Sequence, residues 1–380
     1  MNQPFLLHIV ERLEGFLAKL PASIQKPVLH ELTPLKELFL QQRPPRFVLT
    51  GSNKFSVPEV VGAVFNWTSP DTRDVLMEIF RWRPIEIDGR GMIAVLDARG
   101  ADPNALSNIH AELQREPADI FLHVGDDGGS VEDVDNIAAL LGSHPARVIG
   151  VVLHAAALDM RNISNGEIHR FGDARAKLQT ALQEQRTIRE HLLSVVDLSL
   201  GSDQAANGEA QLLMSKLARE LPNQARVEMI RIARDPAAQI EIAQTLTKST
   251  TAICTAIGAQ PIPLADLPIL TALQLGMVSG IMYISGRERN LRAATEFVGA
   301  LGVNVGAGMV LREGARAVLK FFPGWGNVVC GMVAGAGTYA VGRAAIVYFL
   351  EGVSLRDARR TYRISRQRSK AEPARPSLVE

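Results

Sequence analysis

The chain has 380 residues, enough for two or three domains with a sizeable hydrophobic core. Its 41 basic and 40 acidic side chains balance, which excludes a global field favouring nucleic acid or a membrane surface. The two cysteines, Cys254 and Cys330, lie far apart in apolar segments and exclude a disulfide framework or a zinc-binding spacing. We therefore expect a reducing, cytoplasmic setting.

The first segment is expected to be helical. In residues 1–45 apolar side chains recur every three to four residues, the spacing that buries one face of a helix. Charged residues share that spacing, which is not the pattern of a signal peptide. Pro44 and Pro45 end the pattern, because proline lacks the backbone donor and disfavours helix at the residue before it. The sequence predicts a helical preamble over residues 1–45.

Residues 46–222 alternate short apolar runs with helical stretches. Continuous apolar runs between helices indicate a mostly parallel sheet that is covered on both faces, so an α/β domain is predicted. Any ligand site would lie at the carboxyl ends of its strands. The expected strands are 46–50, 92–98, 119–125, 147–155 and 193–199, and the expected helices lie around 58–66, 104–114, 131–141 and 167–193.

The strand pattern ends at residue 222, and the remaining sequence is helical and rich in glycine. We predict an all-α domain over residues 223–365 and a disordered tail over 366–380. Two uncharged runs, 267–286 and 321–342, have the roughly 20 residues that a membrane span needs.

Pairs of glycines four residues apart recur in this region. Such pairs share one helix face and let a neighbouring backbone approach closely. They suit helices that insert in or lie on a membrane, and they equally suit the buried helices of a soluble bundle, so both interpretations stay open. The pairs are Gly276 and Gly280, Gly302 and Gly306, and Gly331 and Gly335.

A basic segment follows the apolar runs. Residues 356–370 hold six arginines and one lysine against a single aspartate. Beside an apolar helix, this cluster suits anionic lipid headgroups at the cytoplasmic face of a membrane. RNA is the alternative ligand, disfavoured because Tyr362 is the only aromatic residue among the arginines, and a solvated tail is the third interpretation. The arginines are Arg356, Arg359, Arg360, Arg363, Arg366 and Arg368.

The segment after the first expected strand has the layout of a phosphate-binding loop without its chemistry. In the pattern GxxxxGK[ST], backbone N–H groups surround the phosphates, lysine supplies charge and a hydroxyl binds magnesium. Counting from Gly51, Ser56 stands at the second glycine, Val57 at the lysine and Pro58 at the hydroxyl residue. Pro58 suits the first turn of a helix. Lys54, inside the loop, is the cation that could reach a phosphate.

The order of segments resembles an Era-like GTPase that carries a C-terminal helical domain of the YcjF type. The segment LPASIQKPVLHELTPLKELFLQQRPPRFVLTG (20–51) is similar to the approach to the P-loop in that family. The segment GEAQLLMSKLARELPNQAR (208–226) resembles the last helix of the GTPase domain and its exit. The resemblance spans most of residues 17–352.

Two further motifs carry the resemblance. VLDARG (95–100) stands at the place of the DxxG motif, which assigns Asp97 to the magnesium shell and the Gly100 amide to the γ-phosphate. VVLHAAALD (151–159) stands at the place of the guanine-reading NKxD motif, and Ala157 replaces its aspartate. The resemblance therefore implies a P-loop GTPase-like fold in which the lysine, the hydroxyl and the base-reading aspartate are missing.

These losses predict a pseudo-GTPase with no catalytic residue and no cofactor. It would act as a membrane-associated scaffold or regulator at the inner face of a membrane, with an intact GTPase relative or a second copy as partner. The alternative is an atypical GTPase that binds GTP and Mg²⁺ through Lys54 and Asp97.

Other chemistry finds little support in the sequence. The acidic segment GDDGGSVEDVDN (125–136) lacks the EF-hand spacing and is expected to be a solvated loop that leads into a helix N-terminus. The histidines are not at zinc-ligand spacing, and neither a Ser-His-Asp nor a Cys-His arrangement can be argued. We expect no metal site and no binding of nucleic acid.

Overall fold

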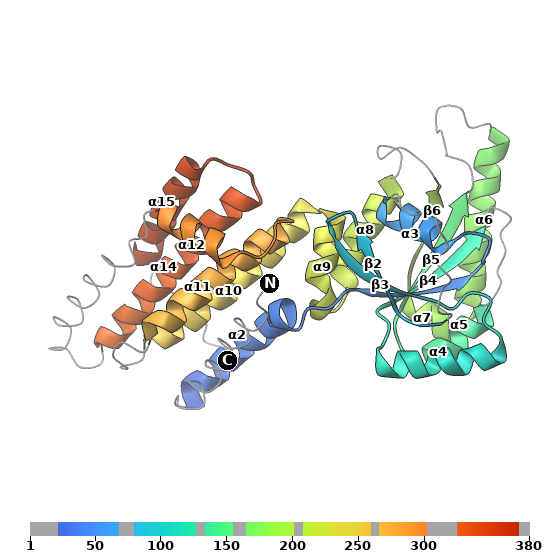
Figure 1. The fold of residues 1–380 in the computed structure, drawn as a ribbon, viewed down its shortest axis with the longest axis horizontal. Helices are drawn as coiled ribbons and strands as arrows, with labels where there is room; N and C mark the ends of the chain where they lie inside the picture. Colours follow the sequence, from blue (N-terminus) through green and yellow to red (C-terminus); the bar gives the residue numbers. More distant parts are fainter. Residues whose placement is uncertain are drawn as a thin grey trace. The chain divides into compact units, whose positions relative to one another are not determined.

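The protein divides into two compact units (Figure 1). Arg43–Ala233 forms the first, which we call the sheet unit. The second, which we call the helical unit, combines Met1–Gln42 with Arg234–Glu380, and all its described elements are helices. This computed structural model describes residues 22–67, 80–126, 134–154, 165–200, 208–259, 266–301 and 325–371.

The sheet unit is built on six strands in the order β2-β3-β1-β4-β5-β6. Neighbouring strands run parallel, except that β2 runs antiparallel to β3 at one edge. The five strands predicted from apolar runs are confirmed, and β2 was missed. The strands are β1 (Arg46–Gly51), β2 (Arg83–Ile87), β3 (Gly91–Asp97), β4 (Ile120–Asp126), β5 (Arg147–His154) and β6 (Leu192–Ser199).

The missed strand β2 has the composition of a sheet edge. Its sequence RPIEI alternates partly exposed and exposed positions until the buried Ile87. Pro84 lacks a donor and Glu86 is charged, two features that protect exposed edges from further pairing. The turn to β3 contains Asp88 and Gly89, both with positive φ (32° and 61°). An Asp-Gly dipeptide in this conformation is typical of the tight turns that connect the strands of β-hairpins.

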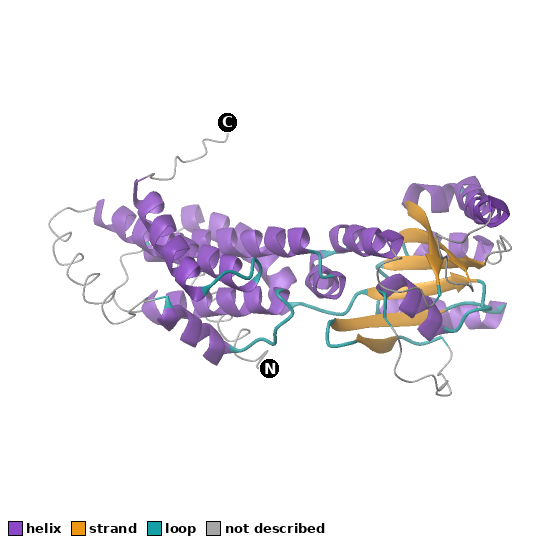
Figure 2. Ribbon diagram, turned by 90° about the horizontal axis from the view of Figure 1, so that it is seen from above, coloured by secondary structure: helices purple, strands orange, loops and turns teal. Residues whose placement is uncertain are grey.

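Helices cover both faces of the sheet (Figure 2). Helices α4 to α7 pack with the strands in one core, and α3, α8 and α9 contact the opposite face. The predicted α/β class, with an all-α region after it, is confirmed. The helices are α3 (Val57–Phe65), α4 (Pro103–Arg115), α5 (Val134–Ser143), α6 (Asn165–Glu184), α7 (Arg186–His191), α8 (Gly208–Glu220) and α9 (Asn223–Ala233), so the long helix expected over 167–193 is broken at Gln185.

Successive side chains of each strand point to opposite faces of the sheet. Val48 and Phe121 are buried in the core beneath α4 to α7. Phe47, next along β1, meets Phe65 of α3 edge to face, with ring centroids 5.2 Å apart. Since both faces of the strands are buried, the apolar runs are continuous, which is why the sequence revealed them.

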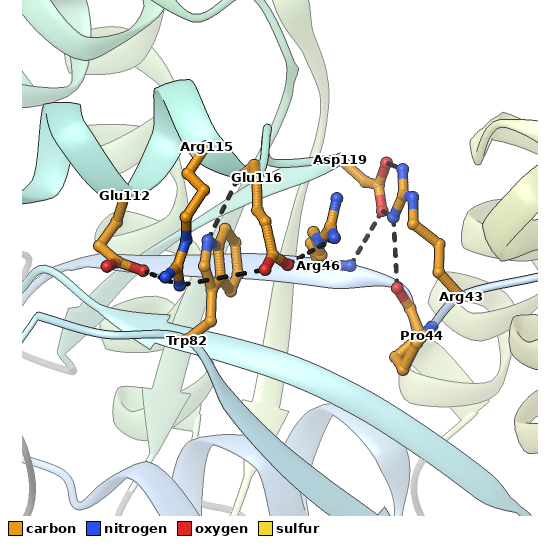
Figure 3. Close-up of polar contacts among 8 residues, drawn as sticks. All are labelled: Arg43, Pro44, Arg46, Trp82, Glu112, Arg115, Glu116 and Asp119. Atoms are coloured by element: carbon orange, nitrogen blue, oxygen red, sulfur yellow. Dashed lines mark hydrogen bonds and ion pairs between the residues drawn. The ribbon is translucent and has the colours of Figure 1, made fainter.

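A buried ion pair anchors the chain where it enters the sheet unit (Figure 3). The Asp119 carboxylate, just before β4, accepts hydrogen bonds from Arg43 Nη1 and Nη2 at 2.7 and 2.6 Å and from the Arg46 backbone N–H at 2.9 Å. Arg46 in turn pairs with Glu116 at 2.5 Å, and Trp82 Nε1 donates to the Glu116 carbonyl at 3.1 Å. These bonds tie the amino ends of the central strands together.

The helical unit gathers segments from both ends of the chain. Helix α2 packs on α10, and Ser249 Oγ donates to Glu31 at 2.6 Å, so the expected preamble shares one unit with the C-terminal helices. The sheet unit extends through α9 rather than ending at residue 222. The elements are α2 (Ala22–Leu35), a π-helical segment (Lys36–Leu40), α10 (Pro236–Gly258), α11 (Asp266–Ile284), α12 (Leu291–Ala300), α14 (Trp325–Phe349) and α15 (Leu355–Ala371).

Helix α15 corrects the predicted start of the tail. Residues 366–371, expected to be disordered, complete this helix, while residues 372–380 lie outside the described part of the chain. The physical reason is burial, since Ala358 and Tyr362, four residues apart, are 0% and 6% exposed and anchor the arginine-rich helix.

Replacing Arg43 with alanine should lower the free energy of unfolding of the sheet unit by about 3 kcal/mol, because Asp119 is only 4% exposed and loses its charged partner. Urea unfolding followed by circular dichroism measures this change. Arg186→Ala is the control, since Arg186 pairs with Glu190 at 3.0 Å on the exposed surface and should matter little. Equal effects of the two substitutions would contradict the anchoring role of Arg43.

Candidate functional site

The candidate site is the loop that follows β1 at the carboxyl end of the sheet. Strand β1 ends at Gly51, whose φ of +86° is a conformation that side chains rarely adopt. A Cβ at this position would lie 2.3 Å from the Val124 carbonyl oxygen, so only glycine fits. The Ser52 N–H then donates to that same carbonyl at 2.8 Å. The tight turn at Gly51 is thus fixed by its close approach to the backbone of β4.

The N-terminus of α3 is capped by its own side chains. Ser56 Oγ accepts from the Glu59 N–H at 3.4 Å, and the Ser56 N–H donates to Glu59 Oε2 at 2.7 Å. Val57 is buried, and Pro58 occupies the first turn as expected. A phosphate would need these same backbone donors, and here it would meet the Glu59 carboxylate instead.

Asp97 is held by an arginine that the sequence analysis did not single out. Arg99 Nε donates to Asp97 Oδ1 at 2.7 Å and Nη2 donates to Oδ2 at 2.9 Å, a bidentate pair. Arg99 Nη1 donates to the Phe55 carbonyl at 2.6 Å and to the Ser52 carbonyl at 3.4 Å. The Arg99 side chain is only 4% exposed. One guanidinium therefore bridges the DxxG-like segment to the loop.

The other candidate residues surround this bridge. Gly100 has φ +65°, and a Cβ there would lie 3.4 Å from Asn53 Nδ2. The Lys54 ammonium, whose side chain is 53% exposed, lies 3.5 Å from Asp126 Oδ2 at the end of β4. The Arg99 bonds bring the loop after Gly51 next to the Asp97–Gly100 turn, and Lys54 of this loop pairs with Asp126.

The end of the sheet where a guanine base would be read holds an ion-pair cluster. Ala157 itself lies outside the described residues. At the end of β5, His154 Nε2 is 3.4 Å from Asp197 Oδ1, and Arg175 Nη1 lies 3.2 Å from Asp197 Oδ2. Glu209 accepts from Arg175 at 3.1 Å and from the Asp197 N–H at 3.0 Å. The Asp197 carboxylate is therefore already paired with cationic and imidazole groups of the chain.

A buried histidine lies beneath the loop. His123 of β4 is 0% exposed, and its Nδ1 is 3.3 Å from Thr50 Oγ1, while Nε2 has no hydrogen-bond partner among the described residues. Burial lowers the pKa of His123 to about 4, so the imidazole is neutral at neutral pH. Its described partner is the buried Thr50 hydroxyl, and no carboxylate among the described residues bonds to it, so we assign it no chemical role.

The expected membrane features lie in the helical unit. Gly331 and Gly335 lie on α14 and Gly276 and Gly280 on α11, whereas Gly302 and Gly306 fall outside the described residues. By length and apolar composition, the 19-residue segment Gly331–Phe349 is the single candidate membrane span found in the described part of the chain, and more than half of it is buried. On α15 the exposed arginines are Arg356, Arg359, Arg360, Arg363 and Arg366, and the side chain of Arg368 is not described.

Among the residues that the structure describes, no group of three or more His, Cys, Asp or Glu side chains is arranged to hold a metal ion.

The sequence match to a known protein covers only part of the chain. No family model matches it. It is 28% identical over 132 residues to magnetosome membrane protein 22 of Magnetospirillum gryphiswaldense, a match over 32% of this chain and 66% of that protein, just under two thirds of its length.

Two solved chains of an oligomerised bacterial dynamin pair, described as a mechanism for long-range sensing and tethering of membranes, are similar at 9% identity. Both matches cover 97% of this chain, and they cover 72% and 76% of the two solved chains. Their TM-scores are 0.31 and 0.30. With scores this low, the fold assignment rests on the strand order and the loop of this chain.

Replacing Arg99 with glutamine should lower the free energy of unfolding by about 2–3 kcal/mol, since charge-assisted hydrogen bonds to Asp97 are lost. Amide hydrogen exchange in residues 52–56 should become faster at the same time. Arg115→Gln is the matched control, because Arg115 is 64% exposed and reaches only Glu112 and Glu116. Unchanged exchange in the loop of the Arg99 variant would refute the bridge.

Acid should destabilise the sheet unit through His123. Above pH 6.5 the residue is neutral in both states and contributes nothing to the pH dependence. Below pH 6.5 the histidine of the unfolded chain binds a proton, whereas the buried histidine of the folded chain binds one only near pH 4. The free energy of unfolding should therefore fall by about 3 kcal/mol across that interval. Urea unfolding at several pH values should show this slope, and His123→Gln should remove it. Identical slopes in both proteins would count against the burial effect.

Proposed function

We propose that the protein is a non-catalytic pseudo-GTPase that acts as a membrane-associated scaffold or regulator. The observation that carries the proposal is the occupation of the phosphate end of the loop by the chain's own groups. The Glu59 carboxylate caps α3, and the Arg99 guanidinium holds Asp97 and the loop carbonyls.

The loop does not fit magnesium and GTP. Both Asp97 oxygens that would serve a magnesium shell are bonded to Arg99. A triphosphate at the N-terminus of α3 would approach Glu59, and neither a lysine nor a hydroxyl residue follows Ser56. Each lost contact worth about 1.4 kcal/mol weakens binding about tenfold, so several losses together leave little affinity.

The membrane part of the proposal rests on three observations. Across 32% of its length, the chain is similar to a magnetosome membrane protein. Gly331–Phe349 has the length and composition of a span, and exposed arginines follow it on α15. We propose anionic lipids as one partner and an intact GTPase relative or a second copy as another, at the cytoplasmic face of a membrane.

The second candidate is an atypical GTPase that uses Lys54 and Asp97. What favours it is the placement of the Lys54 ammonium beside the loop, half exposed and 3.5 Å from Asp126. In this case the Arg99 bridge would have to open before magnesium and GTP could bind.

Calorimetric titration of the purified protein with GTP, GDP and a non-hydrolysable analogue, each with magnesium, separates the two candidates. We expect no binding tighter than about 1 mM, because the charged phosphate contacts are missing. Micromolar binding that Lys54→Ala abolishes, and that the exposed control Lys177→Ala retains, would overturn the proposal and establish the second candidate.

A further inference from the structure

Helix α14, which contains the candidate membrane span, is packed closely along α10 through its glycines. A Cβ at Gly331 would lie 2.9 Å from the Thr255 carbonyl oxygen, and one at Gly335 would lie 2.1 Å from Thr255 Oγ1. A Cβ at Gly342, two turns further on, would lie 2.4 Å from Thr247 Cγ2. The glycine face of α14 is thus fitted to threonine side chains of α10 in the structure.

Polar contacts strengthen the same packing. Thr338 of α14 accepts a hydrogen bond from Gln274 Nε2 of α11 at 2.9 Å and also contacts the wholly buried Cys254 of α10. Thr338 is itself 0% exposed. The middle of α14 is therefore held from two neighbouring helices, which lie beside it in Figure 1.

Helix α10 has the character of a helix in water. Glu241 and Lys248 are exposed on it, and on another side Ser249 bonds to Glu31 of α2. Were α14 to cross a bilayer while docked on α10, these charges would enter hydrocarbon, which is costly. Arg343, within the candidate span, adds a further charge. Crossing would therefore require α14 to leave α10.

We propose that the helical unit attaches to anionic membranes from the surface, through the arginines of α15, while α14 stays packed on α10. This inference rests on the proposed membrane association and specifies its mode. The guanidinium groups would bind lipid phosphates in bidentate geometry, and no helix would cross the bilayer.

The arginines of α15 form one exposed face. Ala358 and Tyr362 are buried toward the bundle, and at about 100° per residue the exposed arginines cover about 120° of arc. Asp357, the acidic residue of this helix, is tied to Ser354 Oγ at 2.6 Å. No carboxylate in the described ranges forms an ion pair with the arginines of this face, which are Arg356, Arg359, Arg360, Arg363 and Arg366.

The surroundings of this face favour lipid over nucleic acid. Single-stranded nucleic acid needs exposed aromatic rings on which bases stack, and Tyr362 is only 6% exposed. Large apolar side chains are instead exposed on the same helical hairpin. Met332 and Val333 of α14 are 38% and 45% exposed, and Ile364 of α15 is 40% exposed. An exposed apolar side chain next to an exposed arginine on one helix, as Ile364 stands next to Arg363, suits the headgroup boundary of a membrane.

Vesicle flotation of the full chain tests the arginine face. We expect binding to phosphatidylcholine vesicles that contain phosphatidylglycerol, little binding to phosphatidylcholine alone, and release at high salt. Replacing Arg356, Arg360 and Arg363 together with glutamine should weaken binding about 100-fold, at about fivefold per arginine. The matched control carries the same charge change at exposed arginines of the sheet unit, Arg186, Arg189 and Arg219, and should bind as the parent does.

A disulfide between α10 and α14 tests whether α14 stays docked. A Cβ at Gly335 lies 3.3 Å from Thr255 Cβ, close to the separation of about 3.5–4.5 Å that disulfides adopt, so Thr255→Cys with Gly335→Cys should cross-link. Burial raises the pKa of the native Cys254 thiol to about 12, which keeps it protonated and unreactive. The oxidised variant should float with anionic vesicles as well as its reduced form does.

Three results would overturn the inference. The first is equal binding to vesicles with and without phosphatidylglycerol. The second is loss of binding on oxidation of the cross-linked variant. Either would leave membrane association standing and reject only this mode of attachment. The third is that the protein binds single-stranded RNA but no vesicle, and that the triple glutamine variant loses this RNA binding. This result would also reject the membrane part of the proposed function. Nucleotide calorimetry tests the remaining part separately.

Discussion

The Arg99 guanidinium places a fixed positive charge where a nucleotide-binding loop would face phosphate and magnesium. It satisfies both oxygens of Asp97 and two backbone carbonyls of the loop at once. With the guanidinium almost fully buried, displacing it would break its bonds to the Asp97 carboxylate and to the loop carbonyls at once. The loop and the Asp97–Gly100 turn are thus held together by the protein itself, without nucleotide.

Glu59 completes this arrangement from the other side. In a working loop the N-terminus of the helix attracts phosphate through its backbone donors and its dipole. Here Ser56 and Glu59 engage that end of α3, and the carboxylate already benefits from the dipole that a phosphate would use. The tight turn at Gly51 is fixed by the Val124 carbonyl oxygen in the neighbouring strand, which leaves no room for a side chain.

The sequence predicted the parts of the fold that depend on continuous burial. Five of the six strands, including the edge strand β6, were visible because their apolar runs are covered by helices. Strand β2, at the other edge, was missed because it alternates exposed and partly exposed side chains. Arg99 was missed although it stands inside the VLDARG segment, since nothing local shows that its side chain turns back to Asp97 and crosses to the loop. The glycine pairs alone fit either a membrane or a bundle, and the close contacts of Gly331 and Gly335 with Thr255, about 80 residues away, could not be read from the sequence.

The central claim is that this loop is closed by the chain and does not respond to nucleotide. Amide hydrogen exchange across residues 51–59 and 97–100, with and without saturating magnesium and GTP, tests it most directly. The account predicts the same exchange rates in both conditions, set by the bonds of Arg99 and Glu59. Slower exchange in both segments on adding the nucleotide would show that the bridge opens to a ligand and would contradict the account.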